Sequence, residues 1–425
     1  MNGRIPTATV SQRVWLRVGT LIDGAASVPL RDAHIVYDRH QILHVGENPP
    51  PRAVLESEQQ SPDAVLPQHT LLPGLIDSHT HLFLEGGELD PAKRSAYVKQ
   101  SPAQLLALAV PRLEKVLRLG VVGCRDAGDK DGVGLALSRL CASRGGAALP
   151  YLDSPGAAIH HRGRYGSFMA EPIENFPSPD ACVEARIRAG ADRIKLIPTG
   201  IIDFKKGAVT SEPQMTAEEI AALVAAAKAH GRQTLAHASG DTGIDHTIDG
   251  GVDTIEHGYF LRDDQLARMR DRNIAWVPTF APVQRQLDHA DRMGHDSTVV
   301  THLHRILDRH AAGLLKAHQL GVTILAGSDA GSCGVAHGLG LLYEMERMEH
   351  AGLSPLTVLH AATGAPSQRL AFKLPFGQVR PGFRSRFLLT EYSPLESVAN
   401  LQRSKTIVFD GDVLGAGESP CTSGL

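Results

Sequence analysis

Two histidines separated by one residue, His79 and His81, follow the run Leu71–Ile76, whose apolar character predicts a buried strand. Residues two apart on a strand point the same way, so both imidazoles project together, with Asp77 on the same side just below them. Two such imidazoles suit one metal ion, which a carboxylate can support from behind. The alternative is a pair of surface histidines, since the chain has 21 histidines in all. The buried-strand context and the donors farther along the chain favour a metal site.

Further donors of metal-ligand type lie near the C-terminal ends of later apolar runs. Lys195 lies within Ile194–Ile197, where a lone lysine flanked by apolar residues is normally costly. Three more donors follow short apolar runs: His237, His257 and Asp329. Each has an ordinary explanation, as a core histidine, a turn aspartate or a lysine that reaches the rim. Because donors of this type recur near the C-terminal ends of successive predicted strands, we instead predict that they share one metal centre.

The elements that must position these donors alternate between strands and helices from Thr70 to about Phe372. Helix starts are marked by Ser178-Pro179 and by the capping box Thr216–Glu219, and glycines mark several helix ends. Seven or eight such units in series predict a parallel (β/α)8 TIM-like barrel over residues 69–372, in the α/β class. Barrel enzymes place their chemistry at the C-terminal ends of the strands, which is where the donors lie.

Short strands and turns occupy both ends of the chain. Val14–Val18 and His34–Tyr37 precede the barrel, and Arg386–Leu389 and Thr406–Phe409 follow it. Neither segment is large enough to stand well alone. We therefore expect residues 1–68 and 373–425 to form one composite, discontinuous β-sandwich domain.

The composition is ordinary for a soluble globular protein of 425 residues, with 42% hydrophobic and 21% charged residues. A formal net charge of -3 gives no electrostatic footprint for nucleic acid or an anionic membrane. No apolar run reaches the ~18 residues that a membrane span needs, and Met1–Arg13 has no secretory signal pattern. The five scattered cysteines fit reduced thiols. We expect a cytoplasmic enzyme that binds neither nucleic acid nor membrane.

Several motifs together resemble those of one large family. They are Leu72–His81, Ile194-Lys195 with Thr199-Gly200, Ala236–Ala238, Ile255–Gly258, Gly327–Gly331, Gly19–Gly24 and His360–Thr363. The chain is similar over nearly its whole length to members of the amidohydrolase superfamily. Within it, the chain resembles imidazolonepropionase-like peptidases and Xaa-Pro or Xaa-Arg carboxypeptidases.

The resemblance implies two divalent metal ions. Zinc suits histidine and carboxylate ligands, although manganese, cobalt or iron would also fit. Lys195 would be carboxylated by carbon dioxide, and burial favours the neutral amine that this reaction requires. The implied ligands are His79, His81 and Asp329 for the more buried ion, His237 and His257 for the other, and carboxylated Lys195 as the bridge.

The implied reaction is hydrolysis of an amide C–N bond by a hydroxide held between the two ions. Asp329 would take the proton of the hydroxide and pass it to the leaving nitrogen. The first expectation for the small-molecule substrate is a peptide or an N-acyl amino acid. Cyclic amides, aryl ureas or carbamates are the nearest alternative, while Lys195 makes a deaminase less fitting and the complete donor set argues against a non-catalytic scaffold. Relatives commonly form symmetric assemblies, so we expect a homo-oligomer.

The loop Ala158–Phe168 is the first place to look for substrate contacts, because barrel specificity lies in such loops. His161 could polarise the substrate carbonyl, and Arg162 or Arg164 could hold a carboxylate, with Tyr165 beside them. The alternative is an exposed basic loop.

A second candidate for substrate contact is Tyr259, directly after His257-Gly258, which could hydrogen-bond substrate or intermediate. One departure from the family pattern concerns Gly243–His246. Relatives often carry an arginine there for a substrate carboxylate, and its absence weakens a carboxypeptidase assignment.

Overall fold

The computed structural model describes residues 5–8, 12–143 and 148–414. The chain divides into two compact units. One comprises Met1–Ile76, Glu114–Gly123 and Ser354–Leu425, and the other comprises Asp77–Leu113 and Cys124–Leu353. Both ends of the chain thus contribute to one unit, as expected, whereas the predicted limits at residues 68 and 373 stay a prediction.

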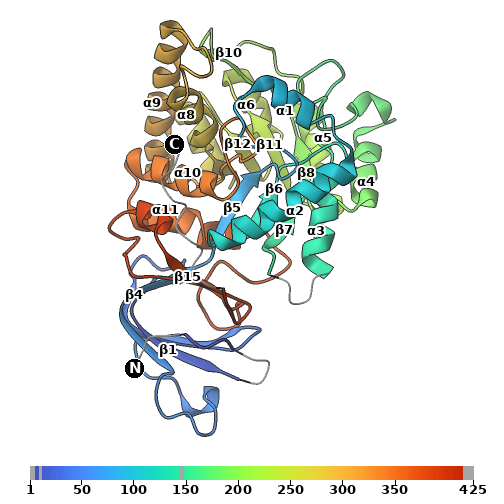
Figure 1. Cartoon of the computed structure of the whole chain (residues 1–425). Coiled ribbons are helices and arrows are strands. Elements are labelled where there is room, and N and C mark those ends of the chain that lie inside the picture. The colour runs from blue at the N-terminus through green and yellow to red at the C-terminus, as the bar shows by residue number, and fades with distance from the viewer. Residues whose placement is uncertain (1–4, 9–11, 144–147, 415–425) are drawn as a thin grey trace. The chain divides into compact units, whose positions relative to one another are not determined.

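The first unit is built on a seven-stranded sheet that draws strands from both ends of the chain (Figure 1). β14 pairs antiparallel with β4, so strands more than 300 residues apart in sequence are neighbours. The core of this sheet is aliphatic with two aromatic rings, Tyr37 and Phe387, packed edge to face at 5.0 Å. In spatial order the strands are β16 (Asp412–Leu414), β15 (Lys405–Phe409), β14 (Arg386–Thr390), β4 (Ala64–Pro73), β1 (Val14–Leu21), β2 (Leu30–Tyr37) and β3 (Ile42–Gly46).

The second unit is organised around parallel barrel strands. Pairing within β8–β11–β12–β13 is parallel, and an isolated bridge joins Ile159 to Leu196 of β8. The eighth position is held by the segment around Ile324, which bridges Trp276 and whose Ala326 carbonyl accepts from the Ser78 amide at 2.9 Å. The regular strands of this unit are β7 (Tyr151–Asp153), β8 (Ile194–Leu196), β11 (Thr234–Ala238), β12 (Thr254–His257) and β13 (Ala275–Val277). The division of the chain into units falls within β5 (Leu75–Thr80) and within β6 (Val121–Asp126). The predicted (β/α)8 barrel with a β-sandwich domain is confirmed.

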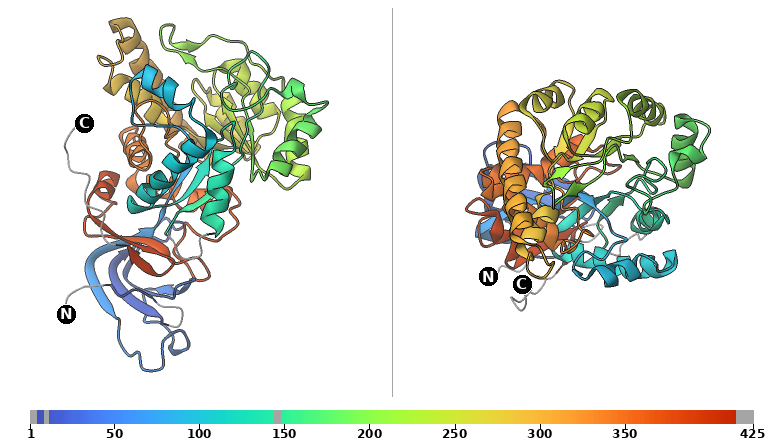
Figure 2. Two further views of the ribbon diagram at one scale, coloured as in Figure 1. Left: turned by 45° about the vertical axis from the view of Figure 1, so that its right-hand side comes forward. Right: turned by 90° about the horizontal axis from the view of Figure 1, so that it is seen from above.

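Helices follow the strands and surround them in the view from above (Figure 2). The predicted helix starts hold: Ser178 caps α4 by accepting from the Ala181 amide, and Thr216 caps α5 by accepting from the Glu219 amide. The helices are α1 (Pro91–Tyr97), α2 (Pro102–Arg118), α3 (Val133–Ser143), α4 (Pro179–Ala189), α5 (Ala217–Ala229), α6 (Asp241–Asp249), α7 (Asp263–Asp271), α8 (Phe280–Asp288), α9 (Ser297–Leu320), α10 (Leu339–His350), α11 (Pro355–Ala361) and α12 (Gly364–Arg369). Short elements complete the set: β9 (Ile202–Asp203), β10 (Ala208–Val209), η1 (Arg52–Val54), η2 (Ile173–Asn175) and η3 (Val398–Gln402).

One predicted strand is divided in the structure. The run Leu71–Ile76 was expected to be a single strand, but it is split at Gly74 between β4 and β5. A Cβ at Gly74 would lie 2.3 Å from a methyl of Val122, so only glycine lets the backbone pass this close. His79 therefore lies within β5, one residue before its end, and its side chain is fully buried.

None of the helices in the described part of the chain is long and apolar enough to cross a membrane.

Candidate metal centre

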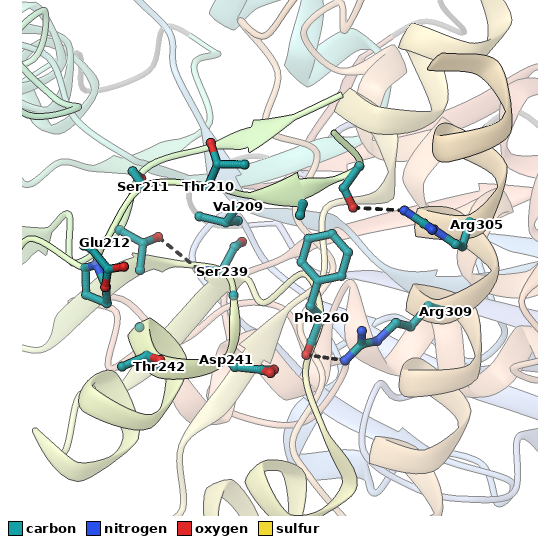
Figure 3. A pocket seen from close by; sticks show the side chains of 16 residues that line it. Val209, Thr210, Ser211, Glu212, Ser239, Asp241, Thr242, Phe260, Arg305 and Arg309 are labelled. Atoms are coloured by element: carbon teal, nitrogen blue, oxygen red, sulfur yellow. Dashed lines mark hydrogen bonds between the residues drawn. The ribbon is translucent and has the colours of Figure 1, made fainter. Parts of the chain in front are cut away.

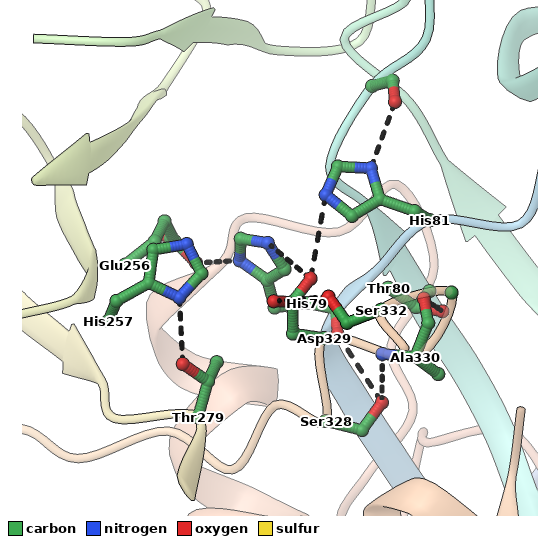
Figure 4. A network of polar contacts seen from close by, with 12 residues as sticks. His79, Thr80, His81, Glu256, His257, Thr279, Ser328, Asp329, Ala330 and Ser332 are labelled. Atoms are coloured by element: carbon green, nitrogen blue, oxygen red, sulfur yellow. Dashed lines mark hydrogen bonds and ion pairs between the residues drawn. The ribbon is translucent and has the colours of Figure 1, made fainter. Parts of the chain in front are cut away.

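The six predicted donors converge at the C-terminal ends of the barrel strands. The ligand atoms of His79, His257 and Asp329 all lie within 4.8 Å of one another. Nε2 of His79 and Nε2 of His81 are each 3.6 Å from Oδ1 of Asp329 (Figure 4). The His237 ring is 4.6 Å from that of His257, centroid to centroid. Donors from different barrel strands therefore meet in one buried cluster. Lys195 belongs to this cluster, because it lines the same cavity as His81, His237, His257 and Asp329.

The orientation of each imidazole is set by an oxygen behind it. Nδ1 of His81 donates to the Gly128 carbonyl at 3.0 Å, and Nε2 of His237 donates to the Gly200 carbonyl at 3.2 Å. A carbonyl can only accept, so the inward-facing nitrogens, Nε2 of His81 and Nδ1 of His237, carry lone pairs. His257 places Nδ1 2.8 Å from Oγ1 of Thr279, which leaves its Nε2 for the centre.

The carboxylate behind His79 is Glu256, not Asp77. Oε2 of Glu256 is 2.5 Å from Nδ1 of His79, and Nη2 of Arg125 donates to both Glu256 oxygens at 2.8 Å. Asp77, which was expected on the same side just below the histidines, accepts from the amide of Ser328 at 2.9 Å and from the amide of His79 at 3.2 Å. Asp77 thus orders the backbone that carries the ligands, and Glu256 orients the His79 ring.

Burial keeps the histidines in the form that binds metal. It lowers the pKa of His81 and of His237 to about 3, and those of His79 and His257 well below their usual value. Burial also lowers the pKa of Lys195 to about 8. Neutral imidazoles are ligands, and a lysine that loses its proton near neutral pH can react as an amine.

An unpaired buried nitrogen also indicates that this donor set holds a metal ion. Nε2 of His79 is buried and has no hydrogen-bond partner among the described residues, although Nδ1 of the same ring is held by Glu256. A buried polar atom without a partner costs free energy. A cation between His79, His257 and Asp329 would satisfy it, and histidine with carboxylate is a donor set typical of zinc and similar divalent ions.

Three residues at this site have a strained backbone conformation. His257, Thr279 and Asp329 have φ values of 68°, 51° and 51°, which place three non-glycine residues in the left-handed region. Such conformations cost about 1–3 kcal/mol each and persist only where the surroundings enforce them. The barrel therefore holds two ligands and one supporting residue in positions that an unconstrained chain would avoid.

The centre opens into a cavity of about 250 Å³. Lys195 is its sole lysine and no arginine lines it among the residues that the structure describes. Most of the wall is apolar: Leu84, Phe168, Met169, Ile197, Ile201, Ile202, Phe204, Pro282 and Val283. Apolar walls with a few convergent polar groups are typical of small-molecule sites.

Of the predicted substrate residues, Tyr165 and Tyr259 line this cavity. The Tyr165 ring lies 5.2 Å from that of His237, centroid to centroid. The Tyr259 hydroxyl donates to the Thr279 carbonyl at 2.7 Å, and its ring stacks on His310 at 4.2 Å. Tyr259 thus supports the wall of the site, and its role towards substrate stays a prediction.

The other three predicted substrate residues do not line the metal cavity. His161 lies between Glu174 and Glu219; burial lowers its pKa, but the hydrogen bonds to the two carboxylates outweigh this effect and raise it. Arg162 donates to Oδ1 of Asn175 at 2.6 Å. Arg164 donates to the Glu212 carbonyl. Their roles in catalysis or substrate binding likewise stay predictions.

A second cavity, of about 530 Å³, shares Ser239 with the first (Figure 3). Two arginines of α9 reach into it, and both donate to backbone carbonyls: Arg305 to Gly207 at 3.4 Å and Arg309 to Phe260 at 2.9 Å. Arginine side chains, which do not line the metal cavity, therefore line the second cavity.

Known proteins show the same architecture. The sequence model of the Amidohydrolase family matches residues 70–414. Ochratoxinase from Aspergillus niger is 26% identical over 418 residues, covering 92% of this chain and 83% of its own. A Xaa-Pro dipeptidase structure with bound methionine in its active site has a TM-score of 0.80 at 25% identity, covering 95% of this chain and all of that one.

Phenylurea hydrolase B shares the fold, with a TM-score of 0.72 at 16% identity, covering 95% of this chain and 97% of its own. The match to the family spans the barrel, all six predicted ligands and the strands that return to the sheet. The chain belongs to the Amidohydrolase family and is a hydrolase that acts on carbon–nitrogen bonds.

Proposed function

We propose that this protein is a binuclear metal-dependent amidohydrolase that cleaves the amide bond of a peptide or N-acyl amino acid with a bulky apolar group. The observation that carries the proposal is a cluster of four imidazoles, one lysine and one carboxylate, all buried except the slightly exposed His81, beside a largely apolar cavity. Zinc as the metal, a homo-oligomeric state and a cytoplasmic location stay predictions.

Two ions need a bridging anion, and we assign this role to Lys195. Its side chain is 2% exposed, and its pKa of about 8 makes the neutral amine accessible. Reaction of that amine with carbon dioxide would give a carbamate, which replaces a buried cation with an anion between the ligands. When bound, the metal ions would lower the pKa of a water molecule and polarise the substrate carbonyl.

Asp329 is positioned to move the proton. Its Oδ2 accepts from the Ser332 hydroxyl at 2.9 Å, while Oδ1 faces the rings of His79 and His81. Without a bound metal ion, burial raises the pKa of Asp329 to about 7. Asp329 would accept the proton of the attacking water and deliver it to the leaving nitrogen.

The apolar wall supports the choice of substrate. Phe204, Ile202 and Phe168 offer burial to an aromatic or branched acyl group or side chain. The structurally similar Xaa-Pro dipeptidase is named for a peptide substrate, which supports this choice.

One observation favours a second candidate. No arginine lines the metal cavity among the described residues, so a free carboxylate beside the scissile bond would have no cationic side chain to pair with once Lys195 is carboxylated. Neutral substrates such as aryl ureas, carbamates or cyclic amides avoid this cost. The shared fold of phenylurea hydrolase B is consistent with that alternative.

A paired-substrate assay separates the two candidates. Zinc-reconstituted protein is given N-acyl phenylalanines and the matching N-acyl phenethylamines, which differ only by the carboxylate, together with aryl ureas. Preference for the acyl amino acid supports the first candidate. Preference for the amine analogue or the urea supports the second, and no chelator-sensitive turnover of any of them would contradict both.

A further inference from the structure

Thr279 stands at the N-cap of α8, yet its hydroxyl does not cap the helix. An N-cap threonine ordinarily accepts a hydrogen bond from the backbone amide two or three residues on. Here the structure records no such bond for Thr279, and its Oγ1 instead lies 2.8 Å from Nδ1 of the proposed ligand His257. The orphan amides of α8 must therefore be satisfied in another way.

A carboxylate from a distant helix takes the place of the cap. Glu344 of α10 is fully buried, and its Oε1 accepts from the Phe280 amide at 2.9 Å. Its Oε2 accepts from the Ala281 amide at 2.8 Å. The next residue, Pro282, has no amide hydrogen to offer. The donors that would normally compete for the Thr279 hydroxyl are thus either occupied or absent.

The same two amide bonds fix the turn that carries Thr279. Thr279 has φ of 51°, a strained conformation for a β-branched residue. Such a conformation needs anchors on both sides. The Tyr259 hydroxyl donates to the Thr279 carbonyl at 2.7 Å, and Glu344 holds the two amides that follow.

We propose that Glu344 is a positioning residue for the metal centre: by capping α8 from α10 it frees the Thr279 hydroxyl to orient His257. The inference rests on the proposed function, because it needs a metal ion at His257. It extends the site to α10, which carries none of the six ligands.

The test measures metal affinity directly. Metal-free protein is titrated with zinc in competition with a chromogenic chelator, and thermal unfolding is followed with and without zinc. Loss of a group that orients a ligating histidine typically costs 10–100-fold in metal affinity. We expect this loss at one of the two sites in Thr279→Val, recovery in Thr279→Ser, and a similar loss in Glu344→Met.

The double variant Glu344→Met with Thr279→Val distinguishes positioning from general loosening. If Glu344 acts through Thr279, the double variant binds zinc no more than about threefold more weakly than Thr279→Val alone. Met345→Ala is the matched control, since it empties a fully buried position on the same helix without touching these bonds. It should lower the unfolding temperature and leave both zinc affinities unchanged.

Three outcomes would overturn the inference. They are an unchanged zinc affinity in Glu344→Met, an equal loss in Met345→Ala, and full additivity in the double variant. If Glu344→Met does not fold, Glu344→Gln, which keeps one acceptor oxygen, is expected to give a smaller loss of the same kind, and wild-type affinity would overturn the inference. A wild-type protein that binds no zinc would instead refute the proposed function, and this inference would fall with it.

Discussion

Replacing Glu256 by glutamine tests the support behind the metal centre most sharply. The substitution keeps the size of the side chain and removes its charge. Glu256 accepts from Nδ1 of His79 at 2.5 Å and from Nη2 of Arg125 at 2.8 Å, and all three side chains are at most 1% exposed. Glutamine would turn an NH2 group towards one of these donors and leave Arg125 as an uncompensated buried cation.

Two magnitudes follow from this geometry. Losing the carboxylate behind a ligating imidazole costs about 10–100-fold in metal affinity, or roughly 1.4–2.7 kcal/mol. Breaking a buried ion pair by removing one partner costs about 3–5 kcal/mol of folding free energy. We therefore expect Glu256→Gln to bind zinc 10–100-fold more weakly and to unfold at clearly lower denaturant concentration, even as metal-free protein.

The assay combines zinc competition with urea unfolding of metal-free protein. Glu114→Gln serves as the control because Glu114 is exposed on α2, and it should change neither quantity. Zinc affinity within threefold of wild type, together with an unfolding free energy within about 1 kcal/mol, would refute the role given to Glu256.

Four further predictions concern the reacting groups and the cavity. Lys195→Ala should lose the second ion and most turnover, and short carboxylic acids should restore part of both; unaltered metal content would argue against the bridge. Because the pKa of Lys195 is lowered to about 8, its neutral form grows as pH rises through that value, so uptake of labelled bicarbonate by metal-free protein should increase between about pH 7 and pH 9, and a flat profile would count against carbamate formation. Asp329→Asn should keep its metal and lose about 10²–10⁴-fold in kcat, whereas near-normal kcat in metal-replete protein would remove the proton-transfer role. Phe204→Ala should lower kcat/KM about tenfold for amides with an aromatic acyl group and spare acetyl amides; an equal loss for both would mean that Phe204 does not select the substrate.

The convergence of the six donors could be predicted from the sequence because each of them lies within or shortly after an apolar run. A charged or imidazole side chain at such a position is costly unless it has a function, and the barrel topology brings all strand ends to one face. The split at Gly74 was not predicted, because an unbroken apolar run carries no sign of the close approach of Val122.

The residues that hold the ligands were harder to find. Arg125 could have been recognised as a candidate from the sequence, because an arginine inside the apolar run 121–126 is as unusual as a lysine at position 195. Glu256, directly before His257, also breaks an apolar run, yet nothing in the sequence says that it reaches across the barrel to His79. Glu344 shows no local signal at all, because its partners on α8 lie more than 60 residues away.

The loop Ala158–Phe168 shows the limit of reading residue types alone. Its arginines suggested a carboxylate site, but the structure pairs Arg162 and Arg164 with oxygens of the protein, whereas Tyr165 and Phe168 of the same loop line the metal cavity. Side-chain direction in an irregular loop depends on tertiary contacts that spacing does not encode.

The measurement that tests the central claim most directly is hydrolysis of an amide panel by protein of known metal content. Mass spectrometry would follow the products, with matched samples that are metal-free, zinc-loaded, and zinc-loaded then chelated. We predict two zinc ions per chain, cleavage of amides with bulky apolar groups only in the loaded sample, and loss of that cleavage on chelation. Cleavage that is equal in metal-free and loaded protein, or loaded protein that cleaves no amide, urea or carbamate of the panel, would contradict the account.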